Sequence, residues 1–127
     1  MNDAAFSTRI AITLTFMAAL IVASVIPGRA QPGDSVLVLL VAKTPTVLQK
    51  AMHVCLYAVL TLLWVWTLEA IQSKSQRLFV AVAVAVCFGA ALEWYQTRIP
   101  GRFGTLLDMV FNATGALLGL LVALLMF

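Results

Sequence analysis

EWYQTRIPGRFGTLLDMVFN, residues 93–112, is the part of the sequence where acidic, amide, basic and turn residues crowd together between two apolar segments. The flanking segments are long enough to cross a bilayer, so these charges stand where one membrane span would end and the next would begin. Charged side chains at such a position are costly unless they are paired or hydrated. We therefore expect any binding or catalytic site of this chain to lie here.

The composition of the whole chain is that of an integral membrane protein. Of its 127 residues 63% are apolar and only 10% are charged, whereas soluble domains carry about 25% charged residues. The length leaves room for about four spans of roughly 20 residues and for no separate soluble domain. We predict an all-α integral membrane fold with one domain over residues 1–127, an antiparallel four-transmembrane-helix bundle.

Turn residues separate the apolar segments that we expect to be the spans. These segments cover residues 10–26, 51–68, 78–95 and 106–127. The first segment could instead be a signal peptide, because a positive charge precedes it and Ala23, Ser24 and Ala30 are small. Its apolar run of 17 residues exceeds the usual core of a signal peptide, so we expect it to remain as a helix.

The longest connection, residues 29–50, contains a short apolar segment of its own. Residues 36–42 are too few to cross a bilayer, so we expect an interfacial segment between the first two spans. Thr44 is expected to cap the second long helix, with Pro45 in its first turn.

Two pairs of small residues occur four positions apart, Ala85 with Gly89 and Gly115 with Gly119. Such pairs let neighbouring helices approach closely, and we expect them to pack within the chain rather than to drive dimerisation. The two cysteines lie inside apolar segments, where we expect small buried hydrophobes and no disulfide.

The polar residues of three spans are expected to converge at one membrane face. In an antiparallel bundle, the start of the second span, the end of the third and the start of the fourth share a face. Residues three, four or seven apart also share one side of a helix. The converging set is Lys50, His53 and Tyr57 on the second span, Glu93 and Gln96 on the third, and Asp108 and Asn112 on the fourth, with Arg98 and Arg102 in the loop.

These residues form two groups by their chemistry. The catalytic candidates are His53, Glu93 and Asp108, which can act as general acids or bases. The ligand-binding candidates are Lys50, Tyr57, Gln96, Arg98, Arg102 and Asn112, whose cations suit a phosphate or pyrophosphate head group. We expect no cofactor and no metal, because a single histidine surrounded by cations is a poor ligand set.

Each candidate also has a structural interpretation. Glu93 and Asp108 could belong to a salt-bridge cluster that fixes the order of the helices, and His53 could be a satisfied interfacial histidine. Asn112 could hydrogen-bond across helices, and Tyr57 could serve packing. The chain would then be a non-enzymatic packing or assembly subunit, with a membrane-protein partner or as a homo-oligomer.

Three ordered motifs resemble those of the VanZ-like membrane proteins. They are Lys50-x-x-His53-x-x-x-Tyr57, then Glu93-x-x-Gln96 followed by Pro100-Gly101-Arg102, then Asp108-x-x-x-Asn112-x-x-Gly115-x-x-x-Gly119. The resemblance implies a four-helix protein of the bacterial inner membrane with a role in the cell envelope, in a family whose founding member is associated with low-level teicoplanin resistance. It implies no established reaction. The expected partner is an anionic membrane lipid, such as an isoprenoid-linked phosphate, which the protein binds or acts on.

The charge distribution sets expectations for partners and orientation. The formal net charge is +3, and the sequence has no run of basic residues. This pattern favours anionic lipid over nucleic acid as a partner. One face carries Arg9, Lys74 and Arg77, and the other carries Arg29, Lys43, Lys50, Arg98 and Arg102. The face with more Lys and Arg residues is expected to be cytoplasmic, which is the face of the second group. If the site residues Lys50 and Arg102 are left out, each face carries three Lys or Arg residues and the rule gives no orientation. The envelope role implied by the resemblance favours cytoplasmic termini and an extracytoplasmic site.

Overall fold

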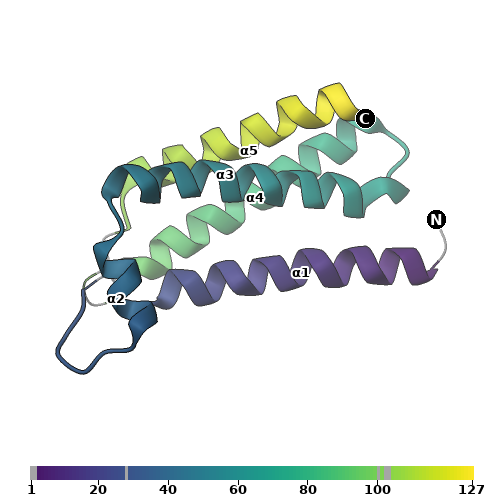
Figure 1. Cartoon of the computed structure of the whole chain (residues 1–127). Helices are drawn as coiled ribbons and strands as arrows, with labels where there is room; N and C mark the ends of the chain where they lie inside the picture. The colour runs from purple at the N-terminus through teal and green to yellow at the C-terminus, as the bar shows by residue number, and fades with distance from the viewer. Residues whose placement is uncertain (1–2, 28, 100, 102–103) are drawn as a thin grey trace.

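The computed structural model describes residues 3–27, 29–99, 101 and 104–127, and this part of the chain contains helices and no strand. The elements are α1 (Asp3–Val25), α2 (Val36–Lys43), α3 (Thr46–Thr67), the 3₁₀ helix η1 (Leu68–Ala70), α4 (Lys74–Gln96) and α5 (Leu106–Met126) (Figure 1). Four of these segments are long and apolar enough to cross a membrane: α1, α3 together with η1, α4 and α5. They indicate a multi-pass membrane protein.

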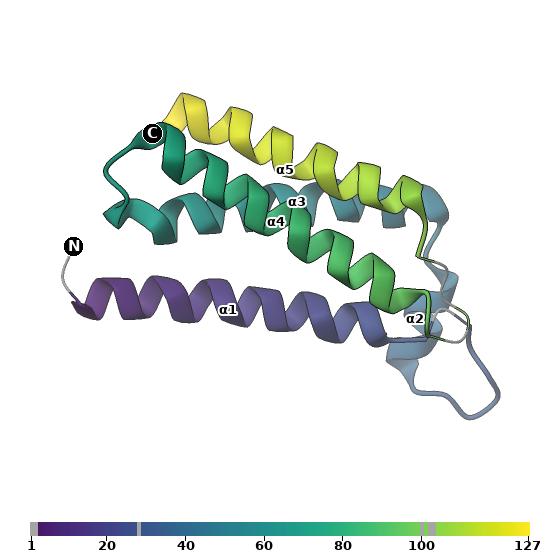
Figure 2. The same cartoon turned by 180° about the vertical axis from the view of Figure 1, so that it is seen from behind.

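The four long helices lie alongside one another, and α2 lies at one end of the group (Figures 1 and 2). At this end, called the α2 end below, α1 and α4 finish and α3 and α5 begin. The opposite end holds the start of α1, the end of α3, the start of α4 and the end of α5. The polar residues of α3, α4 and α5 that the sequence singles out are therefore grouped at the α2 end.

Helix α3 is the central element, because it makes the most extensive contacts with the other long helices, above all with α5. Small residues make its contact with α5 close. A Cβ atom added to Gly119 would lie 2.5 Å from the carbonyl oxygen of Ala58, and one added to Gly115 would meet the carbonyl oxygen of Val54. The expectation that these glycines pack within the chain is confirmed.

The outer surface of the bundle is apolar. Phe79 is 74% exposed and Leu125 is 88% exposed, an arrangement that suits lipid rather than water. The expectation that the cysteines are buried is wrong, because Cys55 and Cys87 are both exposed and both free. The buried positions of α3 and α4 are taken by other residues of the same helices, such as Leu60 and Ala85.

Three helices begin earlier than their apolar segments do: α1, α3, which starts at Thr46, and α4. Helix α1 starts at Asp3, where the hydroxyls of Ser7 and Thr8 donate to the carbonyl oxygens of Asp3 and Ala4 at 2.8 and 2.9 Å. Helix α4 starts at Lys74, after the N-cap Ser73. At α4 the Ser73 hydroxyl accepts from the Gln76 amide at 3.4 Å, which satisfies one of the orphan amides of the first turn.

The expected role of Thr44 is also corrected. Thr44 closes α2: its amide donates to Val41 O at 3.2 Å and its hydroxyl donates to Leu40 O at 2.8 Å. Pro45 is then the N-cap residue of α3, which begins at Thr46. With its hydroxyl bonded back to α2, Thr44 caps the C-terminus of one helix and not the N-terminus of the next.

Candidate functional site

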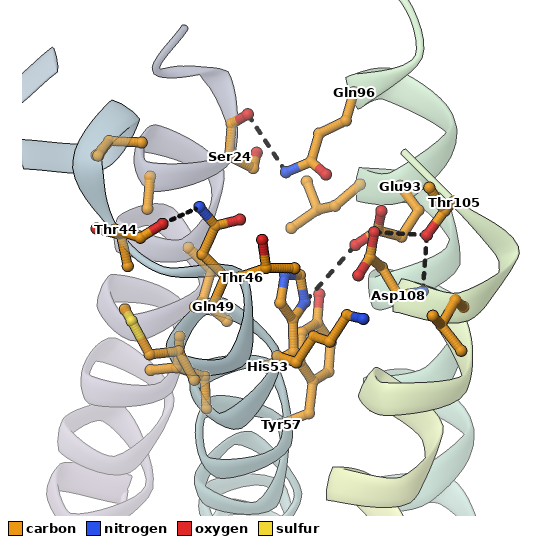
Figure 3. A pocket seen from close by; sticks show the side chains of 18 of the residues that line it. Ser24, Thr44, Thr46, Gln49, His53, Tyr57, Glu93, Gln96, Thr105 and Asp108 are labelled. Carbon is orange, nitrogen blue, oxygen red and sulfur yellow. Dashed lines mark hydrogen bonds and ion pairs between the residues drawn. The ribbon is translucent and has the colours of Figure 1, made fainter. Parts of the chain in front are cut away.

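A cavity of about 480 Å³ opens at the α2 end of the bundle. Its wall includes polar residues, among them Lys50, His53, Tyr57, Glu93, Gln96 and Asp108, and apolar residues, among them Leu20, Ala23, Val41, Met52 and Leu56. Figure 3 shows the labelled polar side chains turned toward this space from several helices. The cavity is therefore amphipathic.

Helix α3 contributes a stripe of polar side chains to this wall. Lys50, His53 and Tyr57 all line the cavity, which agrees with their spacing along one face of a helix. The ammonium group of Lys50 lies 5.6 Å from the centroid of the Phe111 ring, a cation–π distance. Tyr57 is 4% exposed, and its ring fits against α4 at Gly89, where an added Cβ atom would lie 2.8 Å from Tyr57 Cε1.

A hydrogen-bonded chain joins α3, α5 and α4 beside the cavity. His53 Nδ1 lies 2.6 Å from Asn112 Oδ1, and Asn112 Nδ2 donates to Glu93 Oε1 at 3.3 Å. The direct distance from His53 Nδ1 to Glu93 Oε1 is 3.7 Å (Figure 3). Asn112 thus lies between a histidine and a carboxylate, and it is 2% exposed.

The orientation of Asn112 determines which nitrogen of His53 carries a proton. Asn112 donates its NH₂ group to Glu93 Oε1, and an amide oxygen only accepts hydrogen bonds. Its oxygen then faces His53 Nδ1, which must donate. In the neutral imidazole this arrangement leaves Nε2 as the acceptor.

Glu93 and Gln96 are the buried polar residues of the last turns of α4, at 3% and 6% exposure. A buried carboxylate is unfavourable without hydrogen-bond donors, and Asn112 supplies one of them. Gln96 Nε2 donates to the carbonyl oxygen of Ser24 at 3.4 Å, which connects α4 to α1 (Figure 3). The polar side chains thus also hold helices together.

Asp108 lies in the first turn of α5 and takes part in a helix cap. Its amide donates to Thr105 Oγ1 at 3.1 Å, and the Thr105 hydroxyl donates to Asp108 Oδ2 at 2.6 Å. An N-cap threonine three residues before an acidic residue satisfies one of the orphan amides of a helix. Asp108 lines the cavity while holding the start of α5 in place.

Two of the expected ligand-binding residues do not line the cavity, and a third lies outside the described residues. Arg98 is exposed and stacks on the Trp94 ring, with 3.7 Å from its Cζ atom to the ring centroid. Asn112 lies behind the wall, where it bonds to His53 and Glu93. Arg102 and the bend at Pro100 lie outside the described residues, although Gly101 lines the cavity with a φ of 77°, as a turn glycine does.

Some lining residues were not singled out by the sequence. Ser24, Gln49 and Thr105 are among them. The pattern Thr105-x-x-Asp108 before an apolar run is a capping signal that could have identified Thr105. Ser24 takes part through its backbone carbonyl group, for which the sequence gives no signal. Gln49 donates through Nε2 to Thr44 O at 2.9 Å and contributes to the mouth of the cavity.

The donor set of the cavity gives little support for a metal ion. Within the described ranges no group of three or more His, Cys, Asp or Glu side chains is arranged to hold one. The single histidine donates to Asn112 through Nδ1, and one oxygen of Asp108 accepts from Thr105. The arrangement suits hydrogen bonding and proton transfer better than metal coordination.

These features define a class: a helical, multi-pass membrane protein with an amphipathic cavity at one end of its helices. The chain matches no family model, no curated protein and no solved structure at a significant level.

Proposed function

We propose that this chain is a VanZ-like membrane protein whose cavity at the α2 end binds the phosphate or pyrophosphate head group of an anionic envelope lipid. The observation that carries the proposal is the wall of the cavity. It combines Lys50, His53 and Glu93 with an apolar side formed by residues such as Leu20 and Leu56. A ligand with a charged head and an isoprenoid or acyl tail would match both parts.

The proposal includes an arrangement in the bilayer. The four long helices cross as antiparallel spans, and α2 lies at the membrane interface. Helix α2 has 8 residues, which is about 12 Å of helix and too short to cross. Its apolar side chains are exposed, with Val36 at 71% and Leu40 at 62%. The cavity would then open where lipid head groups lie.

Positive charge for a phosphate comes from several parts of the chain under this proposal. Lys50 lines the cavity directly. The stem of Arg29 is close to Gly101, because a Cβ atom added there would lie 3.0 Å from Arg29 Cγ. Arg102 belongs to the same α4–α5 connection in the sequence. One guanidinium group can donate to two phosphate oxygens at once. These arginines would add their positive charge to that of Lys50, the single lysine of the wall.

The hydrogen-bonded chain gives the cavity a candidate general base. With Nδ1 donating to Asn112, the Nε2 atom of neutral His53 can accept a proton from a nucleophile held in the cavity. Glu93 would stabilise the charged histidine, at 3.7 Å from its Nδ1 atom. Proton acceptance at Nε2 is the chemistry that these residues offer toward a bound head group.

Lipid retention tests the proposal. The full-length protein and its Lys50→Gln and Glu93→Gln variants would be purified in mild detergent from bacterial membranes, and bound anionic lipid would be measured by mass spectrometry. We expect Lys50→Gln to lower retention by about tenfold, the effect of one lost charge-assisted hydrogen bond. Lys43→Gln is the matched control, because Lys43 is exposed at the end of α2 and does not line the cavity. Equal retention by all folded variants would refute the proposal.

A second candidate function is that of a non-enzymatic packing or assembly subunit. The observation that favours it is that Asn112 and Asp108 both have hydrogen-bond partners within the protein. The two functions differ in what Glu93→Gln changes. Glu93→Gln keeps the size of the side chain and removes its charge. A structural cluster predicts lower thermal stability with unchanged lipid retention. A lipid site predicts changed retention in a folded protein, because the variant removes the negative charge that Glu93 places beside the head group.

We also propose that both termini are cytoplasmic and that the cavity faces the outside of the inner membrane. Ser35 precedes α2 at one end, and Ser75 lies in the first turn of α4 at the other. In a cysteine-free background, Ser35→Cys would react with an impermeant maleimide in intact spheroplasts, and Ser75→Cys would react only after lysis. The reverse pattern would overturn this orientation.

A further inference from the structure

A second cavity lies at the end of the bundle opposite to α2. Its volume is about 220 Å³, and its lining residues are Arg9, Val65, Trp66, Glu69, Arg77 and Phe127. They come from α1, the end of α3 with η1, the start of α4 and the residue after α5 (Figure 1). Its charged residues come from separate segments of the sequence, and the structure brings them around one space.

Arg9 and Glu69 form an internal pair in this cavity. The Arg9 guanidinium is ion-paired with the Glu69 carboxylate, and its Nη1 atom donates to Trp66 O at 3.0 Å. Its Cζ atom also lies 5.0 Å from the centroid of the Trp66 ring. These contacts neutralise Glu69 and hold Arg9 and Trp66 in fixed positions.

Arg77 is different, because no described residue pairs with it. Its Nε atom is buried and has no hydrogen-bond partner, and its guanidinium forms no ion pair within the described part of the chain. A buried donor without a partner is destabilising, and a guanidinium has five N–H donors to satisfy. Arg77 also lies in the first turn of α4, where the helix dipole favours an anion.

We propose that this second cavity binds the phosphate group of an anionic membrane lipid, with Arg77 as its main ligand. The guanidinium geometry matches phosphate oxygens, and among the side chains that line the cavity, Arg77 is the one that keeps its charge after Arg9 pairs with Glu69. Tryptophan near a span end suits the head-group region. The lipid tails would stay in the bilayer beside the helices, a point that rests on the proposed crossing of the membrane. This site would lie on the face opposite to the first cavity.

The test compares anionic lipid, neutral lipid and free phosphate. Full-length protein in a neutral detergent would be titrated with phosphatidylglycerol, phosphatidylcholine or inorganic phosphate while its unfolding temperature and native mass spectrum are recorded. Phosphatidylglycerol is expected to bind more tightly than phosphatidylcholine, and Arg77→Gln is expected to weaken its binding by about tenfold. Lys74→Gln is the matched control. Lys74 is exposed in the same helical turn and does not line the cavity, so its replacement should change binding less than about twofold.

Several outcomes would overturn the proposal. Equal weakening by Arg77→Gln and Lys74→Gln would mean general surface attraction, and equal binding of the two lipids would exclude an anion site. Inorganic phosphate could also bind in an Arg77-dependent way and displace the lipid completely. The cavity would then be a site for free phosphate and not for a lipid. If Arg77→Gln fails to fold, Arg77→Lys keeps the charge but removes Nε–H, and unchanged phosphatidylglycerol binding by that variant would refute the proposal. Lys50→Gln, in the first cavity, should leave the Arg77-dependent binding intact.

Discussion

His53 Nδ1 lies 2.6 Å from Asn112 Oδ1, so that one hydrogen bond connects the central helix α3 to α5 at the wall of the larger cavity. Asn112 also connects to α4, because its Nδ2 atom donates a hydrogen bond to Glu93 Oε1 at 3.3 Å. The side-chain amide of Asn112 therefore connects three helices. It also determines which ring nitrogen of neutral His53 carries the proton.

Replacement of Asn112 by leucine should destabilise the protein. Leucine has a similar size but leaves His53 and the buried Glu93 carboxylate without this partner, at a cost of about 2 kcal/mol. Thermal unfolding in detergent would measure the loss. Thr114→Val is the control, because the exposed Thr114 hydroxyl donates only to Val110 O of its own helix. Equal stability of the two variants would show that the chain of bonds does not hold the helices.

Gly119→Ala should also destabilise the protein, although alanine is the better helix former by about 1 kcal/mol. The new Cβ atom would lie 2.5 Å from the carbonyl oxygen of Ala58, and two helix backbones would have to separate. Overpacking of this kind costs about 1–3 kcal/mol. Gly89→Ala should cost less, because its closest neighbour at 2.8 Å is the side chain of Tyr57, which can move. An unfolding temperature for Gly119→Ala at or above that of the unchanged protein would contradict the close contact of α3 and α5.

The helical faces could be predicted from the sequence because spacing alone determines them. Lys50, His53 and Tyr57 recur at helical intervals, and all three line one cavity. Arg98 could not be placed in this way. It lies two residues beyond the end of α4, where the helical repeat no longer applies, and its guanidinium stacks on Trp94.

The individual hydrogen bonds could not be predicted from the sequence, because helical spacing does not determine which atoms of two helices meet. Thr44 stands between two helices and could cap either of them, and only the structure shows that its hydroxyl bonds to Leu40 O. The sequence also could not predict that the Nε atom of Arg77 lacks a hydrogen-bond partner, because the residues around it come from distant parts of the chain. Periodicity reports which side of a helix a residue occupies, but not which atom of another helix it meets.

Thr105→Ala should lower stability by about 1 kcal/mol, the usual cost of a lost N-cap. Thr105 accepts from the Asp108 amide at 3.1 Å and donates to the Asp108 carboxylate at 2.6 Å. Ser73→Ala removes the weaker cap of α4, in which Ser73 accepts from the Gln76 amide at 3.4 Å, so it should cost less. Thermal unfolding of both variants and of Thr105→Ser, which should restore stability, would measure the difference. A larger loss for Ser73→Ala than for Thr105→Ala would contradict this ranking of the two caps.

The positions of the cysteines provide a test of whether α3 and α4 lie in lipid. Cys55 and Cys87 are exposed on the outer surface of the bundle, and both lie well inside helices that are long and apolar enough to cross a membrane. If lipid covers this surface, neither thiol should react with an impermeant maleimide in intact or lysed membranes, and both should react after unfolding in dodecyl sulfate. Ser75→Cys, exposed near the start of α4, is the positive control in lysed membranes because it lies close to water. Rapid labelling of Cys55 or Cys87 in lysed membranes would mean that water reaches the outer surface there, and the labelled helix, α3 or α4, would then not be a membrane span.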